Sequence, residues 1–242
     1  MVPSSLAAIL LLSFVFGMRH ALDADHIAAV AALSDGTGGM RRAILRGAAW
    51  GTGHALVLGA VGGVVVLLRV AIPEPVVRLF ESLVAAMLVG LGAAAIVAAA
   101  RARLHVHAHE HDGVGHVHLH FHAARVEHAP ADHGAAPHRH PHPLRFALRP
   151  LLVGGMHGLA GSAALSLLVL ATVPTALLGC AYLVVFGAGS IAGMAIMSLL
   201  LTAPLLLAER RALRLHRALR FAAGLGSVLI GLRLGWQMWR GV

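Results

Sequence analysis

Six long apolar runs limit what this chain can fold into. A helix needs roughly 20 consecutive apolar residues to cross a bilayer, and runs of this kind fill most of the 242 residues. We place the membrane segments at Leu6–Leu33, Ala43–Leu68, Val76–Ala100, Phe146–Val173, Thr175–Ala208 and Ala218–Trp239. The pattern predicts an all-α polytopic membrane bundle of about six transmembrane helices.

Glycines and tryptophans within these runs predict further features of the helices. The fifth segment is long, and its glycines Gly187, Gly189 and Gly193 are expected to bend or interrupt it. Tryptophans collect where a membrane meets water, so the three tryptophans near segment ends, Trp50, Trp236 and Trp239, are expected at that interface.

The overall charge pattern excludes several classes of protein. Only 12% of the residues are charged, about half the share in soluble domains. The formal charge of +9 comes from arginines bunched between apolar runs, with no nucleic-acid-binding motif, so we expect no nucleic-acid partner. Cys180 is the only cysteine, which rules out an intramolecular disulfide and a thiolate metal cluster.

The arginines predict how the chain is oriented in the membrane. Fourteen of the 19 lie in or beside three alternate connections: Arg41, Arg42, Arg46, Arg101, Arg103, Arg125, Arg139, Arg145, Arg149, Arg210, Arg211, Arg214, Arg217 and Arg220. Cytoplasmic loops carry the excess of arginine. We therefore expect a multi-pass protein of the inner (plasma) membrane, with both termini outside and these three connections in the cytoplasm.

A histidine-rich loop divides the chain. Residues 1–100 hold the first three predicted helices, residues 101–145 form the loop, and residues 146–242 hold the last three. Thirteen of the 38 residues from His105 to His142 are histidine, a composition that we expect to be disordered. Alternate positions suit imidazole binding of a divalent transition metal, and the predicted metal-collecting residues are His105, His107, His109, His111, His116, His118, His120 and His122.

The first segment contains five ionisable residues: Arg19, His20, Asp23, Asp25 and His26. Each Asp or Arg at the centre of an inserted helix costs about 2.5–3.5 kcal/mol, and such groups usually mark an ion pathway. On a continuous helix of 3.6 residues per turn, His20, Asp23 and His26 span roughly 120°, while Asp25 lies about 140° from His20. These four converge only if the helix is locally unwound or if another segment wraps around, and Gly17 makes a break plausible. An internal salt bridge of Arg19 is the structural alternative, but it leaves both histidines unexplained.

Two further histidines lie in apolar segments. His54 and His157 are each flanked by glycines, in Gly51-Thr-Gly-His54 and Gly154-Gly-Met-His157-Gly. A single membrane histidine is more often a hydrogen-bonding residue than a ligand, but glycines bring neighbouring helices close. We therefore treat both as candidate ligands or gate residues, and Glu81 as an interfacial charge.

These motifs resemble a known family. His20-Ala-Leu-Asp-Ala-Asp25-His26 resembles the His-x4-Asp-His signature of the nickel/cobalt transporter (NiCoT and NicO) superfamily, and Gly53-His54 resembles its second motif. The stretch from Met156 to Ala164 is similar to the urease-accessory-like permease branch. Well-studied importers of the superfamily have eight spans, with the signature in the second rather than the first. The resemblance implies transport of Ni²⁺ or Co²⁺ by the first, second and fourth segments.

The predicted function is therefore transport, with Ni²⁺ or Co²⁺ as the substrate and no prosthetic group. Uptake is favoured, and efflux, which the long histidine-rich loop also resembles, is the alternative. A metal-dependent membrane enzyme with Asp23 as general base, and a metal buffer built on the loop, are the rivals from other classes. The expected partners are the metal ion and the lipid bilayer, and a partner protein or homo-oligomer is left open. No nucleotide-binding Gly-x4-Gly-Lys motif exists in a chain without lysine.

Overall fold

The computed structural model describes residues 3–34, 39–101, 103–111, 114–122, 147–160, 173, 175–211 and 213–240. Its elements are α1 (Pro3–His20), α2 (Ala24–Leu33), α3 (Gly39–Leu68), α4 (Glu74–Arg101), β1 (Arg103–His111), β2 (Val114–His122), α6 (Ala176–Arg211) and α7 (Leu213–Arg240). Residues 147–160 form a further helix.

The described helices confirm an all-α membrane bundle. Four of them are long and apolar enough to cross a membrane: α3, α4, the Ala176–Pro204 part of α6 and the Arg217–Arg240 part of α7. α1 and α2 pass the same test as a pair bent by 55°, which makes five if the pair is one broken span. Of the predicted fourth segment, residues 147–160 are helical and residues 161–172 lie outside the described part.

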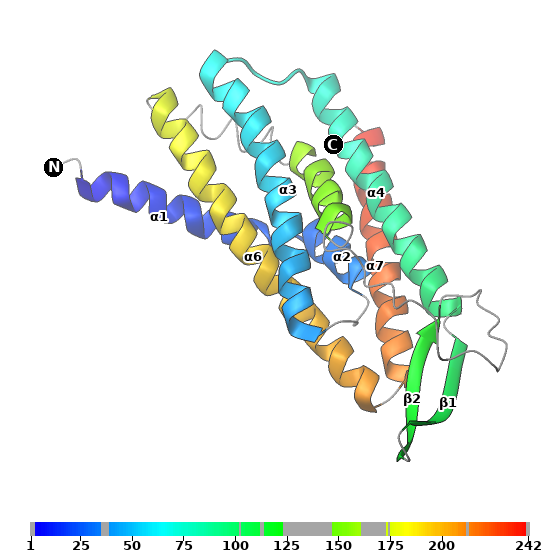
Figure 1. Ribbon diagram of the computed structural model, residues 1–242. Helices are drawn as coiled ribbons and strands as arrows, with labels where there is room; N and C mark the ends of the chain where they lie inside the picture. Colours follow the sequence, from blue (N-terminus) through cyan, green and yellow to red (C-terminus); the bar gives the residue numbers. More distant parts are fainter. Residues whose placement is uncertain are drawn as a thin grey trace.

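Two long helix pairs build the bundle. α3 packs along α6, and α4 packs along α7 (Figure 1). α1 crosses α6 at a steep angle, and α2 then enters the bundle, where it contacts α4, α6 and α7. The break between α1 and α2 therefore lies where elements from both halves of the chain meet.

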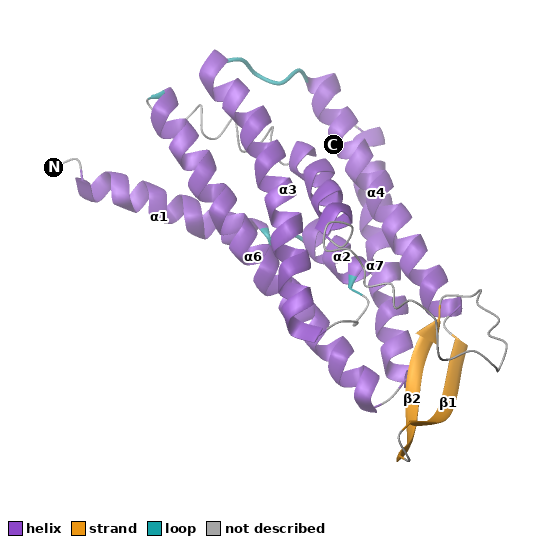
Figure 2. Ribbon diagram, in the orientation of Figure 1, coloured by secondary structure: helices purple, strands orange, loops and turns teal. Residues whose placement is uncertain are grey.

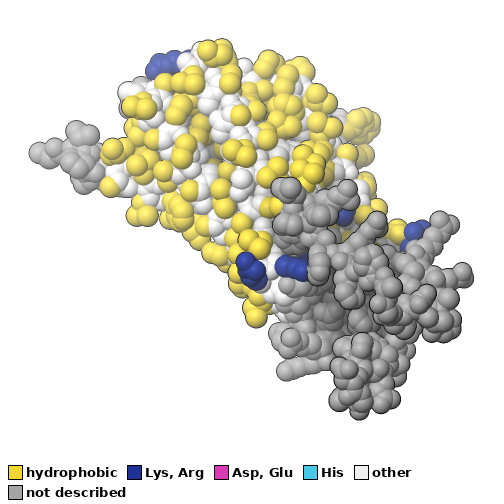
Figure 3. All heavy atoms as spheres, in the orientation of Figure 1, with side chains coloured by type: hydrophobic (Ala, Val, Ile, Leu, Met, Phe, Trp, Pro, Cys, Tyr) yellow, Lys and Arg dark blue, Asp and Glu magenta, His cyan; other side chains and the backbone are white. Residues whose placement is uncertain are grey.

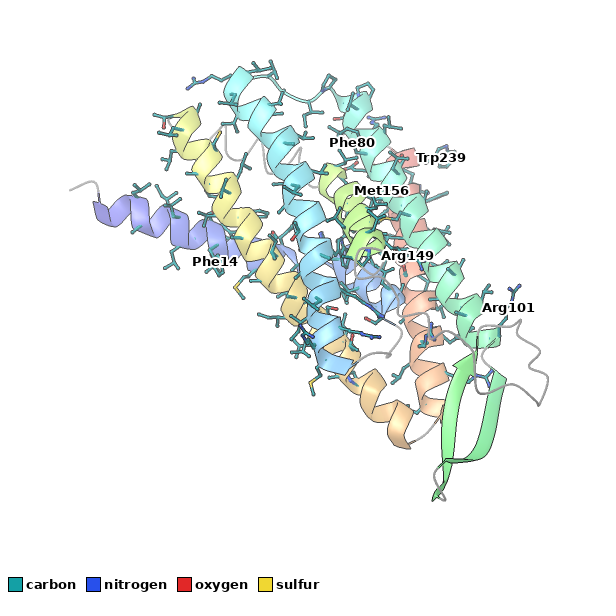
Figure 4. All side chains as sticks on the ribbon, in the orientation of Figure 1. Phe14, Phe80, Arg101, Arg149, Met156 and Trp239 are labelled. Carbon is teal, nitrogen blue, oxygen red and sulfur yellow. The ribbon has the colours of Figure 1, made fainter. Side chains whose placement is uncertain are left out.

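The ends of the bundle match the predicted alternation of the connections. The β1–β2 hairpin, the start of α3 and the turn from α6 to α7 lie at one end (Figure 2), and the α3–α4 connection and the C-terminus lie at the other. Arg101 lies beside the hairpin, whereas Phe80 and Trp239 lie toward the opposite end (Figure 4). The hairpin, the start of α3 and the turn from α6 to α7 therefore share one end, whereas Arg149 lies part-way along the bundle (Figure 4).

Glycines set the close approach of α1 to α6. A Cβ atom added at Gly17 would collide with the carbonyl oxygen of Phe186, and one added at Gly189 would collide with the carbonyl oxygen of Phe14. Gly193 faces Met18 in the same way. Small residues let helix backbones approach closely where no hydrophobic effect holds them together.

The expected interruption at Gly187, Gly189 and Gly193 was wrong. α6 runs without a break from Ala176 to Arg211. These glycines pack against α1 and α3, and a continuous helix keeps its backbone hydrogen bonds satisfied in lipid.

Buried serines link neighbouring helices of the bundle by hydrogen bonds to backbone carbonyls. Ser13 Oγ donates to Tyr182 O (2.7 Å), joining α1 to α6. Ser198 Oγ donates to Ala43 O (2.7 Å), and Ser227 Oγ donates to Leu88 O (2.8 Å). Interhelical bonds of this kind contribute about 0.6–2 kcal/mol each in membranes.

The outer surface is apolar. Leu56, Val184 and Leu177 are each more than half exposed, and apolar atoms cover most of the described face in Figure 3. A surface of this kind suits contact with lipid rather than water.

The expected disorder of the histidine-rich loop was wrong for residues 103–111 and 114–122. They form an antiparallel pair in which His105 lies opposite His120, His107 opposite His118 and His109 opposite His116. Histidine alternates with Val, Ala or Leu there, a strand period, and Asp112-Gly113 between the strands is a dipeptide that favours hairpins. Residues 123–146 lie outside the described part.

Gly189→Ala tests the close approach of α1 and α6. The new Cβ meets backbone atoms of Phe14, which cannot rotate away, so we expect a loss of about 1–3 kcal/mol of stability and a lower melting temperature in detergent. Gly63→Ala is the matched control because nothing lies within 4 Å of its Cβ position. A helical Gly→Ala change without a clash is stabilising by about 0.5–1 kcal/mol; equal melting temperatures for the two variants would contradict this packing.

Candidate metal site

The helix break forms within the charged motif itself. α1 ends at His20 and α2 begins at Ala24. A turn joins them, with Leu22 N donating to Arg19 O (2.8 Å) and Asp23 N to His20 O (3.1 Å). Asp23 adopts an extended backbone (φ −63°, ψ 145°) as the N-cap residue of α2. The predicted unwinding is thus present at residues 21–23, a few residues after Gly17, which packs against α6 instead.

Three histidines from α1, α2 and α3 meet beside this break. The ring centroid of His20 lies 4.5 Å from that of His26 and 5.2 Å from that of His54, and His26 and His54 are also 5.2 Å apart. One ring nitrogen from each lies within 4.8 Å of the other two. His26 and His54 are buried, with 1% and 0% of their surface exposed.

A carboxylate lies behind two of these rings. His20 Nδ1 donates to Asp23 Oδ2 (2.7 Å), and His26 Nδ1 donates to Asp25 Oδ1 (3.1 Å). Because an ionised carboxylate only accepts hydrogen bonds, each Nδ1 carries the proton and each Nε2 keeps a free lone pair. Carboxylates hold metal-binding histidines in this way, fixing the tautomer and orienting the ring.

The free nitrogens are buried. Nε2 of His20, Nε2 of His26 and both ring nitrogens of His54 have no hydrogen-bond partner among the described residues. An unsatisfied buried polar atom costs about 1–3 kcal/mol. Lone pairs from several such nitrogen atoms converge at one point, and a cation can bind to them.

A second group of possible ligands overlaps the first. Asp25, His26 and His157 offer ligand atoms within 4.8 Å of one another. His157 Nε2 donates to Asp25 Oδ2 (2.8 Å), and the backbone N of His26 donates to Asp25 Oδ1 (3.0 Å). The rings of His26 and His157 have centroids 4.1 Å apart. His26 therefore belongs to both groups.

Glycines bring α3 against the helix at residues 147–160, as the sequence predicts. A Cβ atom at Gly53 would collide with the carbonyl of Leu151, and one at Gly158 would lie 2.5 Å from that of His54. Gly154 faces the backbone of Trp50. This contact between helices positions His157 beside the other histidines.

The ring of Trp50 lies beside two of the histidine rings. It is nearly parallel to that of His26 (16°), at 6.1 Å between centroids, and lies 5.9 Å from that of His157. The expectation that Trp50 lies at the membrane interface was wrong, since only 2% of its surface is exposed. Its place four residues before His54, on the same face of a helix, is the sequence signal that could have revealed it.

All six candidate ligands of the membrane segments thus come together. His20, His26 and His54 form one group, Asp25 and His157 join His26 in the other, and Asp23 bonds to His20. Glu81 lies on α4 and belongs to neither group. The eight loop histidines lie on the hairpin strands.

Comparison with known proteins gives the family. Residues 6–235 match the NicO model, described as a high-affinity nickel-transport protein. The chain belongs to the NicO family. The chain is also 33% identical over 233 residues to the urease accessory protein UreH of Bacillus sp. (strain TB-90). The alignment covers 96% of this chain and 92% of the relative. No solved structure matches the chain.

Membership of the NicO family agrees with the resemblance seen in the sequence. This NicO protein is an integral-membrane transporter of divalent transition-metal ions, and nickel is the ion that the family transports.

Trp50 can report on an ion held by this cluster. With Trp236 and Trp239 replaced by phenylalanine, Trp50 is the only tryptophan left of the three. We expect Ni²⁺ to quench its fluorescence in a saturable way, because an open-shell ion near His26 lies within short-range quenching distance, and Mg²⁺ to have no effect. Equal quenching after His26→Ala is added would locate the ion elsewhere.

Proposed function

We propose that this NicO protein carries nickel inward across the plasma membrane and that the ring nitrogens of His20, His26 and His54 hold the ion on the way. One observation carries the proposal: the buried free nitrogens of these residues converge, and carboxylates orient two of the three rings. Asp23 and Asp25 act as the partners of His20 and His26.

The donor set supports a transition metal as the substrate. Imidazole nitrogens suit nickel, cobalt and zinc, whereas magnesium and calcium prefer oxygen ligands. Cobalt fits the same donors, with nickel bound more tightly in the usual order of divalent affinities. The proposed substrates are therefore Ni²⁺ first and Co²⁺ second.

The membrane potential is sufficient to drive uptake. A divalent ion moving inward gains about 4.6 kcal/mol per 100 mV, twice the value for one charge. Efflux would need a second source of energy, such as proton exchange. With the arginine-rich end in the cytoplasm, both termini lie outside, and the hairpin lies on the side that receives the ion.

We assign the hairpin a supporting role as a metal-collecting segment. Its register sets three pairs of histidines opposite each other: His105 with His120, His107 with His118, and His109 with His116. The assignment rests on this backbone register and on the density of histidine, since imidazole is a ligand for divalent transition metals. His111 and His122 extend the same alternation.

Family membership favours transport over a metal-dependent enzyme. Asp23, the general base that such an enzyme would use, bonds to His20 (2.7 Å), which supports a role in orienting that ring.

Transport in liposomes tests the proposal. With purified protein, a nickel-sensing dye inside and an inside-negative potential, we expect nickel entry that reverses direction with the sign of the potential. His26→Ala and Asp25→Asn are expected to lower the initial rate at least tenfold. The first removes a ligand, and the second removes the negative charge and one of the two acceptor oxygens that orient His26 and His157. Glu81→Gln, a carboxylate-to-amide change outside the cluster, is the matched control. Wild-type rates for both cluster variants would refute the site.

Deletion of residues 105–142 tests the role of the hairpin. If the segment only collects metal, transport at saturating nickel remains and the nickel concentration for half-maximal rate rises severalfold. A chain of full length with the thirteen histidines changed to asparagine controls for the loss of the segment itself. Complete loss of transport in both chains would make the loop the functional part.

A further inference from the structure

We infer that the transported ion steps between two overlapping sites that share His26. The first site consists of His20, His26 and His54, and the second of Asp25, His26 and His157. The inference rests on the proposed function, since it takes the same ion as the substrate of both sites, and it adds a second position that the ion occupies in transit.

The geometry supports two positions rather than one large site. Within each group the ligand atoms lie within 4.8 Å of one another, but the rings of His54 and His157 have centroids 6.3 Å apart. His26 lies between them, 5.2 Å from His54 and 4.1 Å from His157. Metal–nitrogen bonds are about 2.0–2.1 Å long, so the two groups define neighbouring coordination centres joined by one ring.

A shared neutral imidazole serves one centre at a time. With the proton on Nδ1, which donates to Asp25, His26 presents Nε2 to the first site. To present Nδ1 to the second site, His26 gives its Nδ1 proton to water and takes one from water on Nε2, so the ring stays neutral. His157 exchanges protons in the same way to free the Nε2 that donates to Asp25. A neutral ring has a single lone pair for a metal, so the two centres are alternative positions of one ion.

Asp25 changes its role between the two positions. While the ion is in the first site, Asp25 accepts hydrogen bonds from His26 and His157. In the second site its carboxylate becomes a ligand. The ion thus moves from three neutral nitrogens to a set with one negative charge, and His26 contributes a different ring nitrogen to each set.

Exposure supports a path that runs through His26. The side chain of His20, in the first group, is 19% exposed, and that of Asp25, in the second, is 28% exposed. The side chain of His26 is only 2% exposed. Each group therefore has one partly exposed ligand and two buried ones, and the buried ligand that the groups share is His26. Conduction requires binding that is weak enough, or spread over enough sites, for the ion to leave, and two adjacent sites meet this requirement.

The test measures binding and transport in the same variants. His54→Gln disables the first site, and His157→Gln disables the second while keeping an amide donor for Asp25; His157→Asn is the substitute if that variant does not fold. Every chain in this test, including the reference called wild type below, carries the thirteen loop histidines changed to asparagine, because the hairpin would otherwise bind nickel as well. Nickel stoichiometry and Kd are measured by titration calorimetry in detergent, ligand type by X-ray absorption at the nickel edge, and transport in liposomes. Glu81→Gln serves as the unchanged control.

The expected results are specific to a relay. The wild type binds one nickel ion per chain. Each single variant still binds one ion, with Kd raised by about 10–100-fold, yet transports at least tenfold more slowly. Nickel in His54→Gln shows a carboxylate oxygen among its ligands. The double variant and His26→Ala lose binding.

Other outcomes overturn one claim or the other. Wild-type binding and transport in His157→Gln would leave a single site at His20, His26 and His54, so the relay would fall and the proposed function would stand. Two ions bound at once in the wild type would also overturn the relay. Wild-type binding and transport in His26→Ala would overturn the proposed function itself.

Discussion

The break in the first membrane segment is the constraint on which the metal site depends. On a continuous helix, Asp25 would lie about 140° away from His20, so the two side chains could not line one cavity. The turn at residues 21–23 and the 55° bend let one carboxylate accept hydrogen bonds from His26 on its own helix and from His157 on a distant one. Because Asp23 is extended, its side chain reaches back to His20 while its backbone carbonyl accepts from Ile27 N (3.0 Å). The break therefore positions both carboxylates at once.

The surrounding bundle holds this irregular segment in place. Gly17 and Gly189 set the contact of α1 with α6, and Gly53 and Gly158 set the contact of α3 with the helix at residues 147–160. These contacts must offset the cost of several buried ring nitrogens without partners, at about 1–3 kcal/mol each. The folded chain is therefore less stable than its helix packing alone would make it. Binding of the ion to the folded chain restores stability by mass action.

Hydropathy and charge predict most of the bundle, because crossing a bilayer demands length and apolarity that are visible in the sequence. The spacing of Asp25 predicts either an unwound helix or a second segment that wraps around, and the structure has the break. The role of the glycines in α6 does not, because a glycine that bends a helix and one that packs against a neighbour look the same until the neighbour is known. Trp50 was assigned to the interface for a similar reason: its partner His157 is more than 100 residues away. The composition of residues 105–142 predicts disorder, whereas the alternation of His with Val and Leu predicts the strands that the structure has.

The charge of the site limits which ions it can pass. Asp23 and Asp25 bring two negative charges to within hydrogen-bond distance of the ligand rings, and the rings themselves are neutral donors. A divalent cation brings the cluster to neutrality, whereas a monovalent ion leaves one uncompensated negative charge near a low-dielectric interior, where charges interact strongly. Asp25, with a 28% exposed side chain, contributes more to this balance than Asp23 at 55%, since water screens an exposed charge. Selection by charge thus rests mainly on Asp25, and selection of transition metals over magnesium rests on the imidazoles, so the two requirements are met by different residues of one cluster.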